Sequence, residues 1–595
     1  MKFPPTNLTE LLREKLAGPD ESAGIGLVSN YAEPGAVETS ASALELALEA
    51  WTLVLGSEGV VCDPEMLRRA STATLPTRAG VPAILRPVNR NDVQECVRVA
   101  NRFGVPIYPV SSGKNWGYGS GAPVQTAVLL DLAGLNRIVD FNEDLAYVTI
   151  EPGVTQRQLY QFLQSRHSRL WMDATGSSPD CSIIGNTVER GFGHTPMGDH
   201  CGNACGFEVV LPTGECVETG FCSFPGAKTG AISRWGVGPS LEGLFSQSNL
   251  GIVTRMSVWL MPAPEYFQAF YFSCRDEQSF ALVIDALRPL RLNQTIRSVV
   301  HIGNDYKVLS GTRQYPWTET NGETPLQGQT LERVRTTLNI GRWNGSGGLC
   351  GTRSQVRAAR RQVRRALRGK AEHLRFVDDR VMRLLRRFAK PYGLITGWDV
   401  SRVLTLMTPV YNLMKGVPTD AMLPSTHWRK TAEPPSHVDP DRDGCGLIWC
   451  SPVAPNTGAD ATIVTRLAER ALLSHGFEPI ITVSLSTERT LTCVISISYD
   501  RSVAGEDERA MACYRTLSGE LLAHGYPPYR LNVCSMNDLD HQSESANLVR
   551  SLKAALDPRG ILAPGRYEPP PLTSSDAAPV ADHGTVSKGR GPDRN

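Results

Sequence analysis

A glycine-rich loop between two short apolar stretches is the feature that most constrains this chain. Residues 109–123 read PVSSGKNWGYGSGAP, and the flanking stretches, 105–109 and 127–132, are each predicted to form a buried strand. Glycine adopts positive φ without strain and lets a ligand approach the backbone. Successive N–H groups in such a turn bind anions, and Lys114 adds positive charge. A surface hairpin is the alternative, but the aromatic and polar side chains among the glycines favour a ligand site.

Length and composition indicate a globular protein with more than one domain. The 595 residues predict two domains, or one large domain with a second inserted into it. A net charge of +1 provides no overall field to attract nucleic acid or an anionic membrane. No secretory apolar segment and no run of about 18 apolar residues occurs, so we expect a cytoplasmic protein. The 14 cysteines lack a CxxC pair, which predicts free, mostly buried thiols and no metal site.

Helix and strand patterns alternate along most of the chain. Helical periodicity occurs at residues 41–51, 91–102, 155–166, 460–476, 504–524 and 544–556, and strand patterns occur at 82–87, 147–154, 207–211, 251–261 and 480–500. This order is typical of a mixed α and β fold. Residues 173–202 are rich in turn formers, which favours a ligand-binding loop. The arginine-rich segment 354–390 is either a nucleic-acid contact or a solvated helix face, and its helical spacing favours the second.

Several motifs, taken in order, resemble the vanillyl-alcohol oxidase and p-cresol methylhydroxylase family of flavoproteins. They cover most of residues 80–568 and lie at 112–119, 151–154, 185–193, 195–200, 207–211, 243–254, 259–262, 289–292, 341–344, 529–530 and 561–566. The resemblance implies an α+β protein, with a two-part FAD-binding domain interrupted by an α/β substrate (cap) domain. The expected organisation is an N-terminal arm at 1–40, an FAD domain at 41–270, the cap at 271–501, a C-terminal return to the FAD domain at 502–568 and a disordered tail at 569–595.

The resemblance also implies which residues hold the FAD. The glycine loop would cradle the pyrophosphate, while two later glycine motifs would lie along the ADP or flavin portion. The expected FAD contacts are Ser112, Gly113, Lys114, Asn115, Trp116, Gly117, Pro152, Gly153, Gly185, Asn186, Glu189, Arg190, Gly193, Gly251, Ile252, Val253 and Arg566. Whether the FAD is covalently attached is left open. The family's histidine position is Leu447 here, its tyrosine position falls near Thr426, and the neighbouring His427 is the candidate for a link.

The family binds a 4-substituted phenol as phenolate between two tyrosines and an arginine, and Tyr118, Tyr529 and Arg530 match these positions. A phenol titrates near pH 10, so ionising it at pH 7 costs about 4 kcal/mol. Charge-assisted hydrogen bonds contribute roughly 1.5–3 kcal/mol each, which is enough. The phenolate then drives hydride loss from the benzylic carbon, and the resulting p-quinone methide is trapped by water or a neighbouring group.

Other family positions have changed. Met422 stands where a glutamate is expected, the family aspartate falls on Ser177, and His194 replaces a tyrosine. The paired cap histidines are replaced by the Thr490-Leu-Thr segment. The identity of the base that activates water is therefore left open. His194 is one candidate, because an imidazole can transfer protons at neutral pH; the alternative is a purely structural role for His194.

These residues predict an FAD-dependent oxidase or dehydrogenase that oxidises the benzylic carbon of a para-substituted phenol. The expected partners are a small phenolic substrate, oxygen or an unidentified carrier as electron acceptor, and a second copy of the chain in a homodimer, with no nucleic acid and no membrane. Two alternatives stay open. In the first, the enzyme oxidises a different biosynthetic alcohol or amine. In the second, the protein binds flavin but does not catalyse a reaction.

Overall fold

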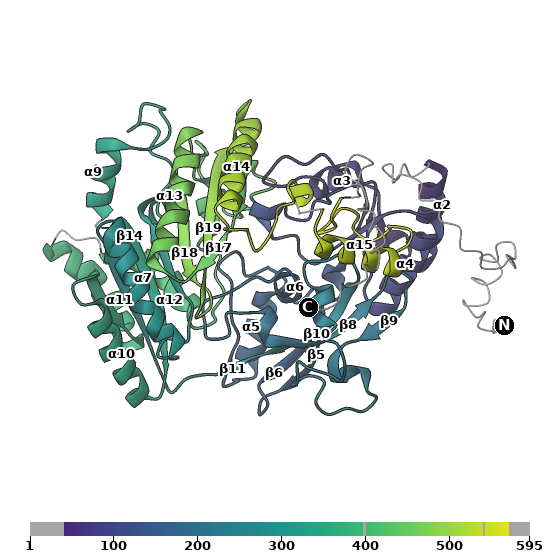
Figure 1. Cartoon of the computed structure of the whole chain (residues 1–595), viewed down its shortest axis with the longest axis horizontal. Helices are drawn as coiled ribbons and strands as arrows, with labels where there is room; N and C mark the ends of the chain where they lie inside the picture. Colours follow the sequence, from purple (N-terminus) through teal and green to yellow (C-terminus); the bar gives the residue numbers. More distant parts are fainter. Residues whose placement is uncertain (1–40, 339, 397–399, 539–541, 571–595) are drawn as a thin grey trace, which may run out of the picture. The chain divides into compact units, whose positions relative to one another are not determined.

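A computed structural model of the chain describes residues 41–570, except 339, 397–399 and 539–541 (Figure 1). The predicted arm at 1–40 lies outside the described residues, as does the predicted tail apart from its first two positions. The described residues belong to one compact unit that begins at Thr39. No helix within the described ranges combines the length and apolarity that a bilayer span requires.

The helices and strands fall into three groups along the chain. The first group is α2 (Ala41–Leu55), β1 (Val60–Val61), α3 (Pro64–Ala70), β2 (Ile84–Leu85), α4 (Arg90–Phe103), β3 (Ile107–Val110) and β4 (Val128–Asp131). The second is β5 (Ile138–Asn142), β6 (Tyr147–Ile150), α5 (Gln156–Ser165), β7 (Leu170–Trp171), α6 (Ile183–Val188), β8 (Ala204–Val210), β9 (Cys216–Glu218), β10 (Ile252–Trp259) and β11 (Met261–Pro262). The third is β12 (Tyr266–Cys274), α7 (Glu277–Leu292), β13 (Val300–Asn304), α8 (Asp305–Ser310), α9 (Gly328–Leu338), β14 (Trp343–Gly351), α10 (Arg353–Leu367), β15 (Glu372–Val377), α11 (Asp379–Thr396), α12 (Val400–Leu413), β16 (Cys445–Cys450), β17 (Val453–Pro455), α13 (Gly458–Ser474), β18 (Ile480–Leu485), β19 (Thr490–Asp500), α14 (Glu506–Ala523) and α15 (Glu544–Leu556).

The glycine loop does not close a hairpin. It joins β3 to β4, which pair parallel in a four-stranded sheet of order β1-β2-β4-β3. Parallel neighbours need a crossover, so the loop must pass from one end of the sheet to the other. The hairpin alternative is therefore wrong, and the loop leaves the carboxyl end of β3, where ligands bind in sheets of this kind.

A second sheet, β5-β6-β10-β8-β9, is antiparallel. Helix α6, which belongs to the turn-rich segment 173–202, contacts strand β10 of this sheet. The apolar face of the sheet packs with α5 around Leu159 and Phe207. Every residue of β8 is buried, including Glu208, whose carboxylate lies 3.3 Å from the Arg90 guanidinium.

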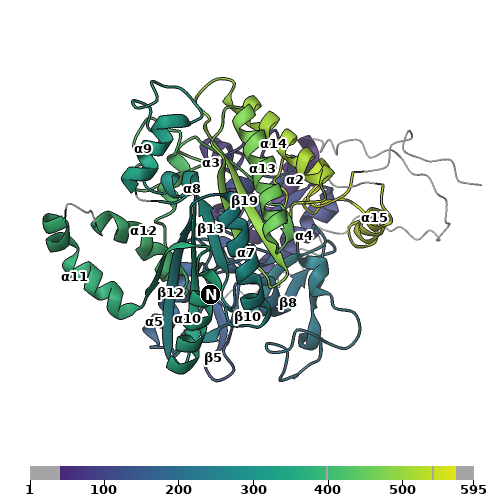
Figure 2. The ribbon, with the colours of Figure 1, turned by 60° about the vertical axis from the view of Figure 1, so that its left-hand side comes forward.

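The largest sheet has eight strands, in the order β15-β12-β14-β13-β18-β19-β16, with β17 paired to β19. All its pairings are antiparallel. One face packs on α7, α10, α13 and α14, which Figure 2 shows in front of the strands. Alternate residues such as Ile481, Val483 and Ile495 fill this core. The period of two sends the intervening residues to the opposite face.

The C-terminal segment contacts the first sheet. Ile107 donates its N–H to the carbonyl of Ile561 at 2.8 Å and accepts from the N–H of Ala563 at 2.8 Å. Helix α14, however, packs in the core of the eight-stranded sheet through Tyr514 and Leu517. The predicted boundary at 501/502 thus separates a helix from the sheet that it covers, and the exact division into domains stays a prediction.

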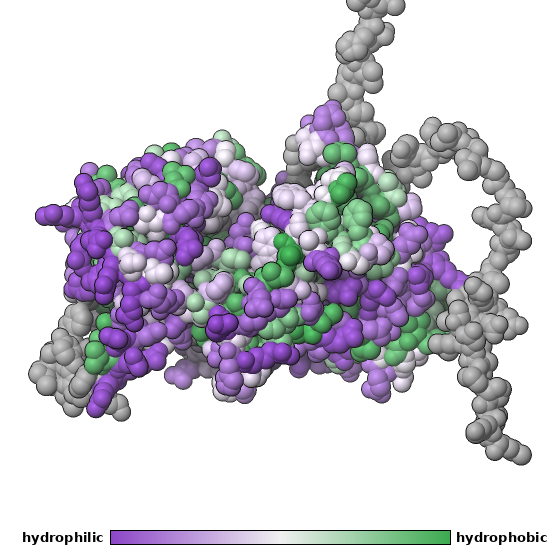
Figure 3. Space-filling model, turned by 90° about the horizontal axis from the view of Figure 1, so that it is seen from below, coloured by the Kyte–Doolittle hydropathy of each residue, from purple (hydrophilic) through white to green (hydrophobic). Residues whose placement is uncertain are grey.

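The arginine-rich segment 354–390 forms most of α10, strand β15 and part of α11. Val356, Val363 and Leu367 of α10 are buried, whereas most of its arginines are exposed. Two arginines lie over the ring of Phe376, with the Arg360 guanidinium 4.9 Å from its centroid. The end of the molecule where Figure 1 places α10 is predominantly hydrophilic in Figure 3. This arrangement agrees with a solvated helix face.

Candidate active site

A cavity of about 630 Å³ lies between the glycine loop, the turn-rich segment and the polar face of the eight-stranded sheet. Its volume is in the range of ligand-binding pockets in proteins. Tyr118, Tyr529, Arg530 and His194, the four predicted catalytic residues, all line it. Thirteen of the predicted FAD contacts also line it, namely Ser112, Gly113, Lys114, Asn115, Trp116, Pro152, Gly185, Asn186, Glu189, Gly251, Ile252, Val253 and Arg566.

The glycine loop offers unused backbone donors to this cavity. The backbone N–H groups of Gly113, Lys114 and Asn115 donate no hydrogen bond to any described residue. Gly113 has φ +63°, and the hydroxyl of Ser112 accepts from the N–H of Ser182 at 2.9 Å, which ties the loop to the start of α6. The buried indole N–H of Trp116 also has no hydrogen-bond partner in the described ranges of the chain. Groups of this kind are satisfied when an anionic or carbonyl-bearing ligand is bound.

Four predicted FAD contacts pack the scaffold instead of lining the cavity. A Cβ on Gly117 would lie 2.3 Å from the ring of Trp449, and one on Gly153 would lie 2.3 Å from the carbonyl oxygen of Ala133. A Cβ on Gly193 would overlap the carboxylate of Asp173. Arg190 has φ +53° and donates from Nε to the Ser246 hydroxyl at 3.1 Å. These positions require small or specially folded residues because protein atoms approach them closely.

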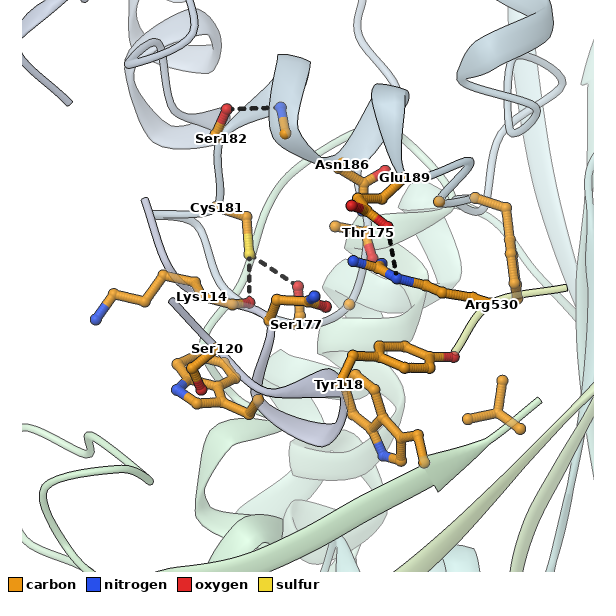
Figure 4. A pocket seen from close by; sticks show the side chains of 18 of the residues that line it. Lys114, Tyr118, Ser120, Thr175, Ser177, Cys181, Ser182, Asn186, Glu189 and Arg530 are labelled. Atoms are coloured by element: carbon orange, nitrogen blue, oxygen red, sulfur yellow. Dashed lines mark hydrogen bonds and ion pairs between the residues drawn. The ribbon is translucent and has the colours of Figure 1, made fainter. Parts of the chain in front are cut away.

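Tyr118, Tyr529 and Arg530 converge although they are far apart in sequence. The Arg530 guanidinium lies 4.4 Å from the centroid of the Tyr118 ring, as Figure 4 shows. The Tyr118 hydroxyl is 2.6 Å from Ser451 Oγ, and the Ser451 carbonyl accepts from the N–H of Tyr529 at 3.0 Å. Burial raises the pKa of both tyrosines, and the proximity of Tyr529 raises that of Tyr118 further, so both hydroxyls keep their protons at neutral pH. Two phenol donors and one cation therefore face the same part of the cavity.

Glu189 orients the arginine. Its carboxylate lies 3.1 Å from Arg530 Nε, accepts from the Tyr567 hydroxyl at 2.8 Å and pairs with Arg566. Burial disfavours the charged form, but Arg566 and Arg530 outweigh this effect and lower the Glu189 pKa to about 2. The predicted FAD contacts Glu189 and Arg566 are thus also partners of the predicted catalytic arginine.

His194 lies beside a second histidine that the sequence did not single out. The rings of His194 and His301 are 4.2 Å apart, and burial lowers the pKa of both. His194 Nδ1 is 3.1 Å from the carbonyl of Ala174; since a carbonyl only accepts, Nδ1 carries the proton and Nε2 keeps its lone pair. Asp173 accepts from the N–H of Thr195 at 2.6 Å and is 2.6 Å from His200 Nε2. Asp173 therefore fixes the backbone at His194.

His427, the predicted candidate for a covalent link, is not among the residues that line the cavity. Its Nε2 lies 3.4 Å from Asp443, and its neighbour Thr426 contributes to the cavity wall instead. Met422 and Ser177, which replace the family's acidic residues, line the cavity and bring no charge to it.

The polar face of the eight-stranded sheet supplies cavity residues that sequence reasoning missed. They are Tyr271, His301, Gly303, Asn344, Ser346, Thr482, Ser484, Ser496 and Ser498. The signal was the alternation within β18 and β19, where Thr and Ser alternate with buried Ile and Val. Alternation alone does not say whether a polar face meets solvent or a cavity.

Comparison with known proteins agrees with this geometry. A sequence model described as an FAD binding domain matches residues 81–220. The chain is 46% identical over 528 residues to 1'-carboxy-chondrochloren decarboxylase of Chondromyces crocatus, which covers 88% of this chain and 97% of the relative. It is 31% identical over 529 residues to the 4-cresol dehydrogenase (hydroxylating) flavoprotein subunit of Pseudomonas putida, covering 87% and 94% of the two chains.

The chain belongs to the vanillyl-alcohol oxidase and p-cresol methylhydroxylase family. A solved structure of p-cresol methylhydroxylase with substrate bound matches it with a TM-score of 0.80 at 29% identity, covering 89% of this chain and 98% of that one. The protein is thus an FAD-dependent oxidoreductase with the α+β, two-part FAD-binding fold of this family, as the sequence predicts. The site fits an FAD. The glycine loop and the Trp116 indole offer N–H donors that no described residue accepts from, and one cavity joins these donors to Tyr118.

Proposed function

We propose that the protein oxidises the benzylic carbon of a para-substituted phenol. The observation that carries the proposal is the convergence of Tyr118, Tyr529 and Arg530 on one part of the cavity. Two neutral phenol donors and a guanidinium favour a phenolate oxygen over the neutral phenol, because charge-assisted hydrogen bonds stabilise the ionised form. FAD, when bound, accepts the hydride that the benzylic carbon releases.

Each residue has a separate task in this proposal. Arg530 supplies the positive charge, Glu189 holds the guanidinium over Tyr118, and Ser451 fixes the Tyr118 hydroxyl. His194, with Nε2 unprotonated, accepts a proton from water that adds to the p-quinone methide. Tyr118 and Arg530 are 5% and 6% exposed, so solvent screens their interactions with a phenolate only weakly.

Replacing Arg530 by methionine tests the proposal. Loss of one charged hydrogen bond of roughly 1.5–3 kcal/mol predicts about 10- to 150-fold weaker binding of 4-alkylphenols and 4-hydroxybenzyl alcohols. The measurement is the anaerobic loss of flavin absorbance at a series of phenol concentrations. Arg501→Met is the matched control, because Arg501 is also partly buried and paired, with Asp507 at 3.0 Å, but does not line the cavity. Equal phenol oxidation by the wild type and the Arg530→Met variant with FAD bound refutes the assignment.

A second candidate function is oxidative decarboxylation. It is favoured by the 46% identical relative, whose name describes the decarboxylation of a carboxylated compound. Hydride loss from the benzylic carbon gives the same p-quinone methide. If the adjacent carbon bears a carboxylate, the carbon–carboxylate bond breaks, CO2 leaves, and its electron pair restores the phenolate with a new alkene. No water is consumed, which agrees with the absence of acidic residues at positions 177 and 422.

The two candidates differ in their products. Benzylic oxidation trapped by water yields an alcohol or carbonyl compound, whereas decarboxylation yields one CO2 and one 4-alkenylphenol per flavin reduced. A single anaerobic turnover with 3-(4-hydroxyphenyl)propanoate, followed by measurement of CO2 and of the phenolic product, separates them. Flavin reduction without CO2 supports trapping by water.

A further inference from the structure

Lys307 is a cation in the cavity wall that the proposed oxidation does not use. It lies in the first turn of α8, where the Asn304 side chain accepts from its backbone N–H at 3.0 Å. The stem of its side chain lies against Gly303 of β13, so closely that a Cβ on Gly303 would be 3.2 Å from Lys307 Cγ. The end of β13 and the start of α8 therefore fix this side chain where it lines the cavity.

Lys307 differs from the other cations that line the cavity because, among the described residues, no carboxylate forms an ion pair with its ammonium group. Lys114 lies 3.6 Å from Asp439, and Arg530 and Arg566 both pair with Glu189. In the part of the chain that the structure describes, no acidic group or acceptor takes the Lys307 ammonium. Burial lowers its pKa, and no neighbouring charge opposes this effect. Lys307 is half-buried and lines the cavity without a carboxylate partner among the described residues, so a ligand with a negative charge would complete the site.

The position of Lys307 relative to the phenol site follows from the strand order. Tyr118 packs edge-on against Trp449 of β16, with ring centroids 5.4 Å apart. Lys307 stands over Gly303 of β13, and β19 and β18 lie between these two strands. Three strand spacings correspond to about 14 Å. The floor between them carries Thr482 and Ser496, whose side chains line the cavity.

A further polar atom on this side of the cavity has no hydrogen-bond partner among the described residues. It is the buried Tyr271 hydroxyl, and both Tyr271 and His301 line the cavity. Tyr271 of β12 lies opposite Ser346 of β14 in the sheet register. Ser346 in turn lies opposite His301 of β13. This edge of the cavity thus offers one cation and a further donor to a ligand, whereas the opposite edge holds the tyrosines and arginine.

We propose that Lys307 binds a carboxylate carried by the para substituent of the substrate. The substrate class is then a para-substituted phenol with an anionic side chain, which lies along the polar face of the sheet with its phenol oxygen at Arg530. This inference rests on the proposed function, because Tyr118, Tyr529 and Arg530 define the phenol end.

The test compares two probes that differ in charge, 4-propylphenol and 3-(4-hydroxyphenyl)propanoate, on the holoenzyme and on the Lys307→Met variant. The dissociation constant of each probe is read from the change it causes in the FAD absorbance, which does not require turnover. Loss of a charged hydrogen bond predicts that the preference of the enzyme for the carboxylated probe falls about 10- to 150-fold in Lys307→Met. Lys307→Arg keeps the charge and should retain most of the preference.

Lys430→Met is the matched control, because Lys430 is also largely buried but pairs with Asp500 at 2.7 Å and does not line the cavity. Its probe preference should equal that of the wild type. Equal weakening of both probes by Lys307→Met overturns the inference and assigns the lysine to the cofactor instead. So does a wild-type enzyme that binds the neutral probe as tightly as the anionic one. Binding of the anionic probe without flavin reduction by either phenol overturns the proposed oxidation and not the Lys307 assignment.

Discussion

Two glutamates in this protein have the same lowered pKa but should differ in their contribution to stability. Glu189 and Glu65 each have a pKa of about 2, lowered from 4.5. For Glu189, burial opposes ionisation and is outweighed by Arg566 and Arg530; for Glu65, hydrogen bonds from Arg68 and Arg69 are the main cause. The Glu189 side chain is 12% exposed and that of Glu65 is 49% exposed. Solvent screens the second cluster and not the first.

We expect Glu189→Gln to destabilise the protein and Glu65→Gln to leave it unchanged. A shift of about 2.5 pKa units at 1.36 kcal/mol per unit gives about 3 kcal/mol for Glu189. The variant also leaves two buried guanidinium groups without their anion, which acts in the same direction. With an unfolding entropy of about 2.1 cal/mol/K per residue, this corresponds to a melting temperature lower by about 2–3 °C.

The sign with pH follows from the lowered pKa. Glu189 stabilises the folded state fully above about pH 4.5, and this contribution is lost as the pH falls towards 2. The assay is thermal unfolding by circular dichroism at pH 7 with saturating FAD, with flavin content measured for each variant. A Glu189→Gln variant within about 0.5 °C of the wild type, or a Glu65→Gln variant that loses as much, would show that burial of the cluster does not decide its strength.

Two further predictions concern the surroundings of the glycine loop. Burial raises the pKa of Asp441 to about 7, against a 2.8 Å hydrogen bond from Ser120; because the folded state then retains a proton that the unfolded chain loses, stability falls between about pH 4 and 7. Asp441→Asn should therefore raise the melting temperature at pH 8 by up to about 3 °C and not at pH 4, and equal shifts at both pH values would contradict this. Gly117→Ala would place a Cβ 2.3 Å from the Trp449 ring, so we expect it to cost roughly 1–3 kcal/mol and to slow phenol-dependent flavin reduction. Wild-type stability and reduction kinetics in this variant would refute the packing role of Gly117.

The sequence predicts the recurring local parts of this protein well. The helices at 91–102 and 155–166 are confirmed as α4 and α5, because a regular apolar period is a local signal; the structure places their N-caps at Asn89 and Thr155. The glycine loop and the Tyr529-Arg530 pair are identifiable in the sequence because their residue types and order are distinctive. Membership of the flavoprotein family and the binding of FAD followed from these short motifs.

The tertiary structure decided what depends on partners distant in the chain. It showed that β3 and β4 are parallel and that α14 covers the eight-stranded sheet. It also placed His427 outside the cavity wall and paired Glu189 with Arg530. Sequence patterns report propensity and periodicity within one element, whereas each of these facts depends on contacts between different elements, which for Glu189 and Arg530 are more than 300 residues apart.

Lys307 illustrates the same difference at a single residue. In the sequence it is one lysine in a short polar segment, without a motif around it. The structure places Lys307 in the cavity wall, because α8 directly follows β13. No described carboxylate pairs with its ammonium group. Residue types and their order determined that this chain is a flavoprotein of its family. The folding of one sheet face over the cavity decided which side chains its substrate meets, because charge and burial at a site are set by every element that packs there.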